Sequence, residues 1–174
     1  PAGGVAFMSQ SGALGVSILD TAQSLGIGVS SFVSAGNKAD VSGNDLLTFW
    51  RDDPSTRVVL MYLEGLGNAA RFVELAREIS RKKPICIVKS GRSSAGARAA
   101  ASHTGAIAGT DLAVDGIFDQ AGVLRADTVD ELFDVAMALA NQPLPRGNRV
   151  AIVTNAGGPG IIIADACEAE GLEI

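Results

Sequence analysis

The stretch from Arg57 to Leu63 reads Arg-Val-Val-Leu-Met-Tyr-Leu, and Glu64-Gly65 follow it directly. The residues after the arginine are apolar on both faces of an extended chain, which is typical of a strand buried inside a parallel sheet. A helical pattern follows at 69–80. Similar alternation on both sides of this segment predicts βαβ units with right-handed crossovers, and therefore a sheet covered by helices on both faces.

Outward from that strand, the sequence predicts four more strands and a set of helices. Only 90–109, rich in Ser, Gly, Ala, Arg and Thr, is predicted as a long loop, and such a loop in a compact domain is usually functional. The fold class is therefore α/β, with a doubly wound five-stranded parallel sheet of order 2-1-3-4-5. Strands are expected at 4–8, 28–34, 57–63, 84–89 and 122–125, and helices at 13–25, 45–50, 69–80, 110–120 and 128–140, where Thr128 and Glu131 form a capping box.

Two prolines, two asparagines and a glycine break the pattern at 141–148, which predicts a linker. The first domain then covers 1–140, and 149–174 is the first βα unit of a second, similar domain that is truncated. That unit is predicted to have a strand at 149–154 and a helix that ends near Glu170. The chain opens on Pro1 without an initiator methionine, so we expect a fragment of a longer protein.

Composition indicates a folded chain and excludes several classes of protein. Of 174 residues, 47% are hydrophobic and 19% charged, and the net charge of −5 gives no reason to bind nucleic acid or an anionic membrane. No apolar run approaches the roughly 18 residues of a membrane span, and no signal peptide is present, so a cytoplasmic location is expected. Cys86 and Cys167 are predicted to be buried thiols. No Cys/His spacing suggests a metal site, and none is predicted.

Two strand-to-helix turns, at 9–12 and 154–157, have the same sequence pattern. In each, a buried strand is followed by a hydroxyl residue, an amide residue, a small residue and a glycine that begins a helix. A helix N-terminus offers free N–H groups to phosphate, and glycine lets the anion approach the backbone. The alternative is a tight βα turn needed for packing alone. Neither turn is a Walker loop or a dinucleotide fingerprint. The candidate phosphate-binding residues are Ser9, Ser11, Gly12 and Ala13 in the first turn and Asn155, Gly157 and Gly158 in the second.

Glu64 and His103 are the candidate catalytic residues. The carboxyl ends of neighbouring parallel strands share one rim, so the turn at Ser11, Glu64 and the His103 segment should meet there. A carboxylate beside an imidazole orients the ring and stabilises its protonated form. Such an imidazole, facing a helix N-terminus, is suited to act as a nucleophile toward phosphorus. The plainer alternatives are a surface histidine without a role and a glutamate that complements a helix dipole.

Four motifs together resemble the NDP-forming acyl-CoA synthetases, ADP-forming acetyl-CoA synthetases among them, which belong to the succinyl-CoA synthetase superfamily. They are Ser9–Gly15, Glu64-Gly65, Ser102–Ala106 and Thr154–Gly160. The resemblance implies a flavodoxin-like ligase domain with a phosphohistidine, followed by the start of the next ligase domain. It implies that His103 carries a phosphoryl group between acyl phosphate and a nucleoside diphosphate, with Glu64 as its partner. The helices that begin near Ser11 and Gly157 would stabilise the phosphohistidine.

The resemblance also implies what the complete enzyme needs beyond this chain. A CoA-binding Rossmann domain and an ATP-grasp domain of the same enzyme are expected partners, with phosphate or acyl phosphate, and a homodimer is a further expectation. CoA, a nucleoside di- or triphosphate and Mg would serve the complete enzyme, none of them bound tightly by this chain. The chain alone is expected to be inactive.

Two other functions are alternatives to this one. The first is an acyl-CoA-sensing, non-ligating module of a protein lysine acetyltransferase, in which the histidine need not react. The second is a flavodoxin that binds FMN, which fits poorly. Aromatic residues make up 5% of the chain, and neither Trp50 nor Tyr62 is in a rim loop suited to a flavin. The acyl group and the nucleotide base stay open.

Overall fold

The structure is a computed structural model of the 174-residue chain. It describes residues 1–36, 38, 40–104, 111–143 and 145–174, with residues 101, 103 and 104 described by their backbone alone. The chain divides into two compact units, Pro1–Gln142 and Pro143–Ile174. No helix among the described residues is long and apolar enough to cross a membrane.

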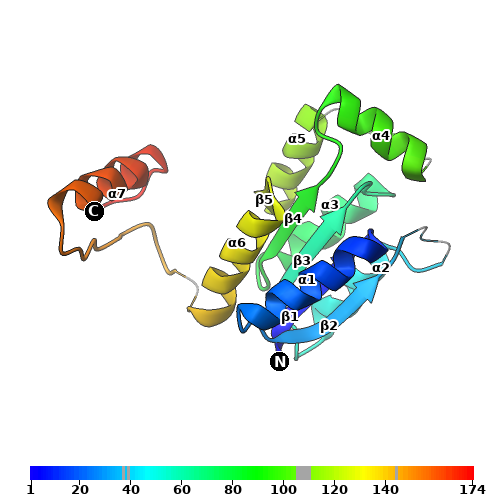
Figure 1. The fold of residues 1–174 in the computed structure, drawn as a ribbon, viewed down its shortest axis with the longest axis horizontal. Coiled ribbons are helices and arrows are strands. Elements are labelled where there is room, and N and C mark those ends of the chain that lie inside the picture. The colour runs from blue at the N-terminus through cyan, green and yellow to red at the C-terminus, as the bar shows by residue number, and fades with distance from the viewer. Residues whose placement is uncertain (37, 39, 105–110, 144) are drawn as a thin grey trace. The chain divides into compact units, whose positions relative to one another are not determined.

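The first unit is built on one five-stranded parallel sheet (Figure 1). The strand order is β2-β1-β3-β4-β5, which confirms the predicted doubly wound topology. Because the order reverses between β1 and β3, the carboxyl ends of those two strands flank the usual ligand position of such sheets. The strands are β1 (Ala2–Ser9), β2 (Val29–Ser34), β3 (Val58–Leu63), β4 (Ile85–Lys89) and β5 (Leu124–Ala126).

Helices cover both faces of the sheet, and two separate apolar clusters result. One cluster joins the sheet to α2 (Gly43–Asp52), α3 (Ala69–Ile79) and α5 (Asp111–Ala121). The other joins it to α1 (Gly12–Ser24) and α6 (Val129–Asn141). Alternate residues of β3 belong to opposite clusters, as expected of a strand that is apolar on both faces.

The capping box at the start of α6 forms only in part. The Thr128 hydroxyl accepts the backbone N–H of Glu131 at 3.1 Å, as predicted. The Glu131 carboxylate, however, accepts the N–H of Asp127 at 2.7 Å, one residue earlier than a reciprocal capping box requires.

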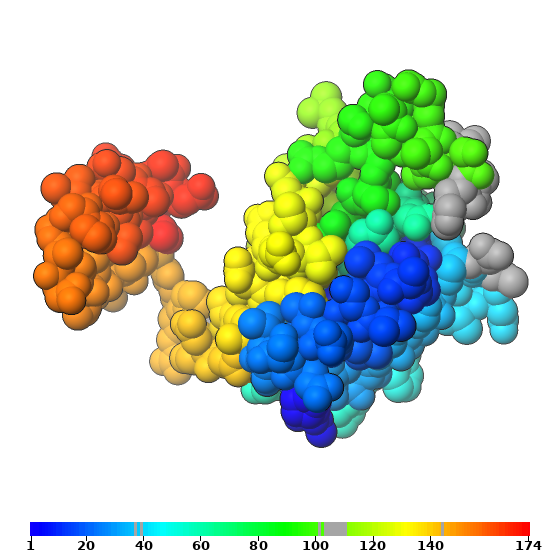
Figure 2. Space-filling view, in the orientation of Figure 1, coloured from blue at the N-terminus to red at the C-terminus, as the bar shows by residue number. Residues whose placement is uncertain are grey.

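The prediction of a loop at 90–109 is wrong for Ser94–Thr104, which form the helix α4. Five of these eleven residues are alanine, the strongest helix former, and this outweighs the glycine and serines that suggested a loop. The Ser93 hydroxyl accepts the N–H of Gly96 at 3.0 Å and so caps the first turn. Residues 105–110 lie outside the described residues. In the space-filling view, α4 forms a ridge on the surface of the first unit (Figure 2).

In the second unit the predicted helix is present as α7 (Gly157–Ala169), but the predicted strand at 149–154 is not regular. Among residues 143 and 145–174, the structure has a single parallel bridge, between Arg149 and Glu173. A strand needs a partner along its length, and residues 172–174 offer the only pairing segment described in this unit.

Candidate active site

The turn after β1 is held by the Ser9 side chain. Its buried hydroxyl accepts the backbone N–H of Ser11 at 3.1 Å and donates to the Ser11 carbonyl at 2.7 Å. Ser11 then caps α1, because its hydroxyl accepts the N–H of Leu14 at 3.3 Å. The Ser9 hydroxyl is therefore occupied within the turn. Contact with phosphate stays a prediction for this turn, and it would involve Ser11, Gly12 and Ala13, which are not buried.

The turn before α7 has the same internal hydrogen bonds. The Thr154 hydroxyl accepts the N–H of Ala156 at 3.1 Å and donates to its carbonyl at 3.0 Å. The two turns are therefore similar in their hydrogen bonds as well as in their sequences. The two turns differ at the cap, where Ala156 lacks the side-chain bond that Ser11 makes. Phosphate binding by Asn155, Gly157 and Gly158 stays a prediction.

Gln10 connects the turn after β1 to the turn after β3, a role that the sequence analysis missed. Its Oε1 accepts the backbone N–H groups of Glu64 at 2.7 Å and Gly65 at 3.1 Å, and its Nε2 donates to the Gly65 carbonyl at 2.9 Å. The side chain is buried, with 6% of the residue exposed. The sequence feature that could have indicated this role is an amide side chain between two turn-forming serines. The sequence analysis noted it only as part of the repeated pattern.

One open pocket of about 440 Å³ joins the segments that the sequence predicted to share a rim. It brings Ser11 and Glu64 together with the residues after β4 and with α4. The half-buried Glu64 follows β3 immediately, as its position in the sequence requires. The lining residues are Ser11, Tyr62, Glu64, Ser90, Gly91, Gly96, Ala99 and Ala100.

His103 belongs to α4, three positions after Ala100. Its side chain is outside the described part of the structure, so the predicted contact between His103 and Glu64 stays a prediction. What the structure establishes is that α4, which contains His103, borders the pocket through Gly96, Ala99 and Ala100.

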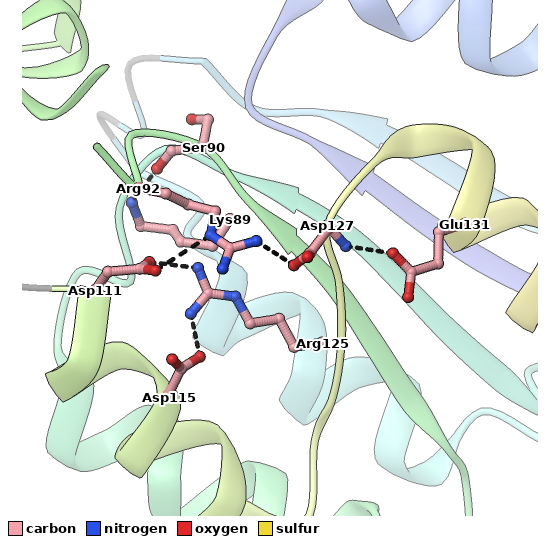
Figure 3. A network of polar contacts seen from close by, with 8 residues as sticks. All are labelled: Lys89, Ser90, Arg92, Asp111, Asp115, Arg125, Asp127 and Glu131. Atoms are coloured by element: carbon pink, nitrogen blue, oxygen red, sulfur yellow. Dashed lines mark hydrogen bonds and ion pairs between the residues drawn. The ribbon is translucent and has the colours of Figure 1, made fainter. Parts of the chain in front are cut away.

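A charged network lies at the beginning of α4 (Figure 3). Arg92, two residues before the helix, donates from Nε to the Asp111 carboxylate at 3.1 Å and also pairs with Asp127. Arg125 of β5 pairs with Asp111 and Asp115. The hydrogen bond from the Arg125 guanidinium lowers the pKa of Asp111 below its ordinary value, and Arg92 lowers it by a smaller amount. The network therefore ties the beginning of α4 to the start of α5 and to β5.

Lys89 is the last residue of β4 and is buried, with 7% of its surface exposed. Burial lowers its pKa, and the nearby Arg125 lowers it further. Its ammonium group donates to the Ser90 carbonyl, beside the pocket that Ser90 lines. The described residues contain no group of three His, Cys, Asp or Glu side chains placed to hold a metal ion.

Comparison with known proteins gives a consistent result. Residues 2–139 match a family described as the succinyl-CoA ligase like flavodoxin domain. The chain is 51% identical over 172 residues to the alpha subunit of an ADP-forming acetate–CoA ligase I from Pyrococcus furiosus, covering 99% of this chain and 37% of that one. It is 46% identical over 167 residues to an ADP-forming 4-hydroxybutyrate–CoA ligase from Nitrosopumilus maritimus, covering 95% and 24%.

A solved structure agrees with these relatives. The dinucleotide forming acetyl-coenzyme A synthetase 1 of Ca. Korarchaeum cryptofilum, in complex with phosphate and ADP, matches with a TM-score of 0.94 and 44% identity. The match covers 99% of this chain and 38% of that one. The chain thus spans little more than a third of the alpha subunit and of the solved chain. None of the relatives named here is described as an acetyltransferase.

Proposed function

The chain belongs to the family of succinyl-CoA ligase like flavodoxin domains, and on that premise we propose that it is the phosphohistidine-bearing central part of an NDP-forming acyl-CoA synthetase. The complete enzyme would convert acyl-CoA, NDP and phosphate into acid, CoA and NTP, and the reverse. The relatives described as ADP-forming ligases support this reaction class. By itself the chain would hold one reaction centre and would not turn over.

The observation that carries the proposal is the single pocket bordered by Ser11, Glu64 and α4. A helix N-terminus, a carboxylate and the helix containing the only histidine of the chain border one space. These are the groups that a phosphoryl relay needs: a place for the anion, a nucleophile and a partner that orients the nucleophile.

The relay would proceed in three balanced steps. Phosphate, held at the start of α1, attacks the thioester carbonyl; a C–O bond forms, the C–S bond breaks, and the CoA thiolate takes up a proton. The imidazole of His103 then attacks phosphorus, and the acid leaves as its carboxylate. Finally, a terminal oxygen of NDP attacks phosphorus, which breaks the P–N bond and releases NTP.

Glu64 would act in the second step. An imidazole that attacks phosphorus becomes positively charged, and a carboxylate that accepts its other N–H stabilises that charge and fixes the tautomer. Gln10 would position Glu64, because it fixes the backbone of the turn on which the carboxylate lies.

The remaining parts of the reaction need other domains. A CoA-binding Rossmann domain and an ATP-grasp domain of the same enzyme would supply the thiol and the nucleotide, and the start of α7 would offer a second anion site. Magnesium would accompany the nucleotide. The enzyme would work in the cytoplasm, and a homodimer is part of the proposal.

Phosphoenzyme labelling tests this function directly. The full-length protein that contains this chain, incubated with labelled NTP and a divalent metal, should acquire an acid-labile, base-stable label at His103. His103→Ala should abolish the label, because no second histidine exists in this chain. A wild-type protein that takes up no label would contradict the proposal, and an active acetyltransferase domain elsewhere in that protein would favour the sensing module instead.

A further inference from the structure

One ion pair joins the two ends of the segment that contains His103. Arg92 lies two residues before α4, and Asp111 is the first residue of α5. The Arg92 Nε atom donates to the Asp111 carboxylate at 3.1 Å (Figure 3). Residues 93–110, with His103 among them, therefore lie in the sequence between two side chains that contact each other.

Arg125 anchors this ion pair in the interior of the first unit. It belongs to β5, and its side chain is only 12% exposed. Its guanidinium pairs with Asp111 and Asp115 and lies 5.9 Å from the centre of the Phe118 ring, which is a cation–π contact. Phe118 belongs to the core cluster on that face of the sheet. An isolated surface ion pair contributes little, but a network that includes a largely buried arginine holds its members in place.

The helix α4 has no apolar anchor in the described part of the chain. None of its residues whose side chains are described is buried, and it contributes to neither of the two apolar clusters. Most helices of folded proteins are held by an apolar face that packs on the core. The position of α4 therefore depends more on the contacts near its ends.

The chain turns back sharply at the beginning of α4. Gly91 has a φ of 79°, in the left-handed region that favours glycine. A Cβ atom at Gly91 would lie 3.4 Å from the Ala100 Cβ, and one at Gly96 would lie 3.3 Å from the Gly91 Cα. Because Gly96 and Ala100 line the candidate active-site pocket, this turn packs on the part of α4 that borders the pocket. The residue that follows the turn is Arg92.

We propose that this network is a positioning clamp, which sets the orientation of α4 beside the pocket and so prepares His103 for phosphorylation. The clamp consists of Arg92, Asp111 and Arg125. Because it ties both ends of segment 93–110 to β5, it restricts the positions that are open to α4. The inference rests on the proposed function, because it takes His103 to be the phosphorylated residue.

Phosphorylation of the full-length protein that contains this chain tests the clamp. Rapid-quench experiments measure label uptake from NTP for wild type, Arg92→Met and Asp111→Asn. Each substitution removes one charge of the ion pair, so the rate at saturating NTP should fall about tenfold, as expected for the loss of a charge-assisted hydrogen bond. The KM for NTP should stay unchanged, because the clamp positions the phosphoryl acceptor and does not bind the nucleotide. Arg92→Lys, which keeps the charge, should restore most of the rate.

Two control variants separate this role from a general loss of stability. Asp127→Asn removes the other carboxylate that pairs with Arg92. Since Asp127 is not at either end of segment 93–110, the rate should stay close to that of wild type. Lys83→Met removes two hydrogen bonds of 2.7 Å each, from the ammonium to backbone carbonyls at the end of α2, and Lys83 lies before β4 whereas Arg92 lies after it. This variant should lower the free energy of unfolding without slowing label uptake.

Hydrogen exchange of the same full-length proteins shows how firmly α4 is held, without any need for phosphorylation. Mass spectrometry of peptides that cover Ser94–Thr104 should find exchange about tenfold faster in Asp111→Asn than in wild type, because the helix opens locally when its clamp is weakened. Asp127→Asn and Lys83→Met should leave the exchange of these peptides unchanged.

The outcomes distinguish failure of the clamp from failure of the proposed function. If wild type takes up label and both Arg92→Met and Asp111→Asn are labelled at the same rate, the clamp is overturned and the function stands. A loss of rate in Asp127→Asn as large as that in Asp111→Asn would also overturn the clamp. If wild type takes up no label, the proposed function fails. Faster exchange of α4 in Asp111→Asn would then still support a clamp on that helix, and unchanged exchange would overturn it.

Discussion

Gln10 Oε1 accepts the backbone N–H of Glu64 at 2.7 Å, so a side chain from the end of β1 fixes the residue that follows β3. The two turns are 54 residues apart in sequence and adjacent in the sheet. Because the contact is to the backbone, it holds the turn without engaging the Glu64 carboxylate. The turn that bears the Glu64 carboxylate is therefore fixed through its backbone by a side chain from the end of β1.

Replacing Gln10 with leucine should destabilise the first unit and slow phosphorylation of the full-length protein. The N–H groups of Glu64 and Gly65 lose their acceptor, at a cost of about 1–3 kcal/mol in the free energy of unfolding. Urea unfolding of the 174-residue chain measures the loss, with Gln23→Leu, at an exposed glutamine, as the control. Equal stability of the two variants would mean that the contact contributes nothing.

Glu64→Gln should keep the fold and slow phosphorylation of His103 by about 10²–10³-fold, as expected for one preorganised electrostatic partner. The amide can still hydrogen-bond the ring but no longer stabilises its positive charge. Rapid-quench measurement of label uptake from NTP gives the rate. A wild-type rate would leave Glu64 with no part in the chemistry.

Asp111 should make the stability of the first unit depend on pH at acidic values. Its pKa is lowered in the folded state by Arg125 and Arg92, so its contribution is present above the unfolded value of about 3.9 and is lost as the pH falls through the folded value. The slope from this one group is at most about 1.4 kcal/mol per pH unit.

Asp111→Asn tests this dependence. The variant should be less stable than wild type at pH 7, and the difference should disappear as the pH falls through the folded pKa of Asp111, which lies below its ordinary value. Urea unfolding across the pH range measures both, with Asp20→Asn at an exposed position as the control. A constant gap between wild type and Asp111→Asn at all pH values would contradict the electrostatic account.

Cys86 should resist alkylation in the folded protein. Burial, and to a smaller extent Glu131, raises its pKa to about 12, so almost no thiolate exists at pH 8. Intact-mass measurement after iodoacetamide treatment should find Cys86 unmodified in native conditions and modified in urea. Both cysteines are buried free thiols in the structure, as the sequence analysis predicted. Rapid native labelling of Cys86 would mean that β4 opens readily.

Phosphate should bind weakly at the turn after β1. Titration followed by NMR should shift the backbone amide signals of Gly12 and Ala13, because these residues open α1 and are exposed. Ser11→Ala removes the hydroxyl that caps the first turn of α1 and should weaken the shifts. Phosphate-dependent shifts confined to other parts of the chain would count against this turn.

The strand order could be read from the sequence because β3 is apolar on both faces and the helical segments between strands allow only parallel pairing. The rim position of Glu64 followed from that order. The helix α4 could not be predicted from the sequence, because its alanines favour a helix while its glycine and serines favour a loop. The position of α4 beside the pocket is a tertiary feature that the sequence pattern does not reveal. Gln10 was missed because its partners are backbone groups, which leave no trace in side-chain patterns.

The division of β3 between two cores has a consequence for cooperativity. Leu60 faces the layer of α1 and α6, while Met61, its neighbour, faces the layer of α2, α3 and α5. Neither helical layer can unfold and leave the other packed on an intact sheet, because both layers pack against β3. The first unit is therefore expected to lose both of its helical layers in one transition, and the reaction rim, attached to the ends of that strand, would persist for as long as the whole unit does.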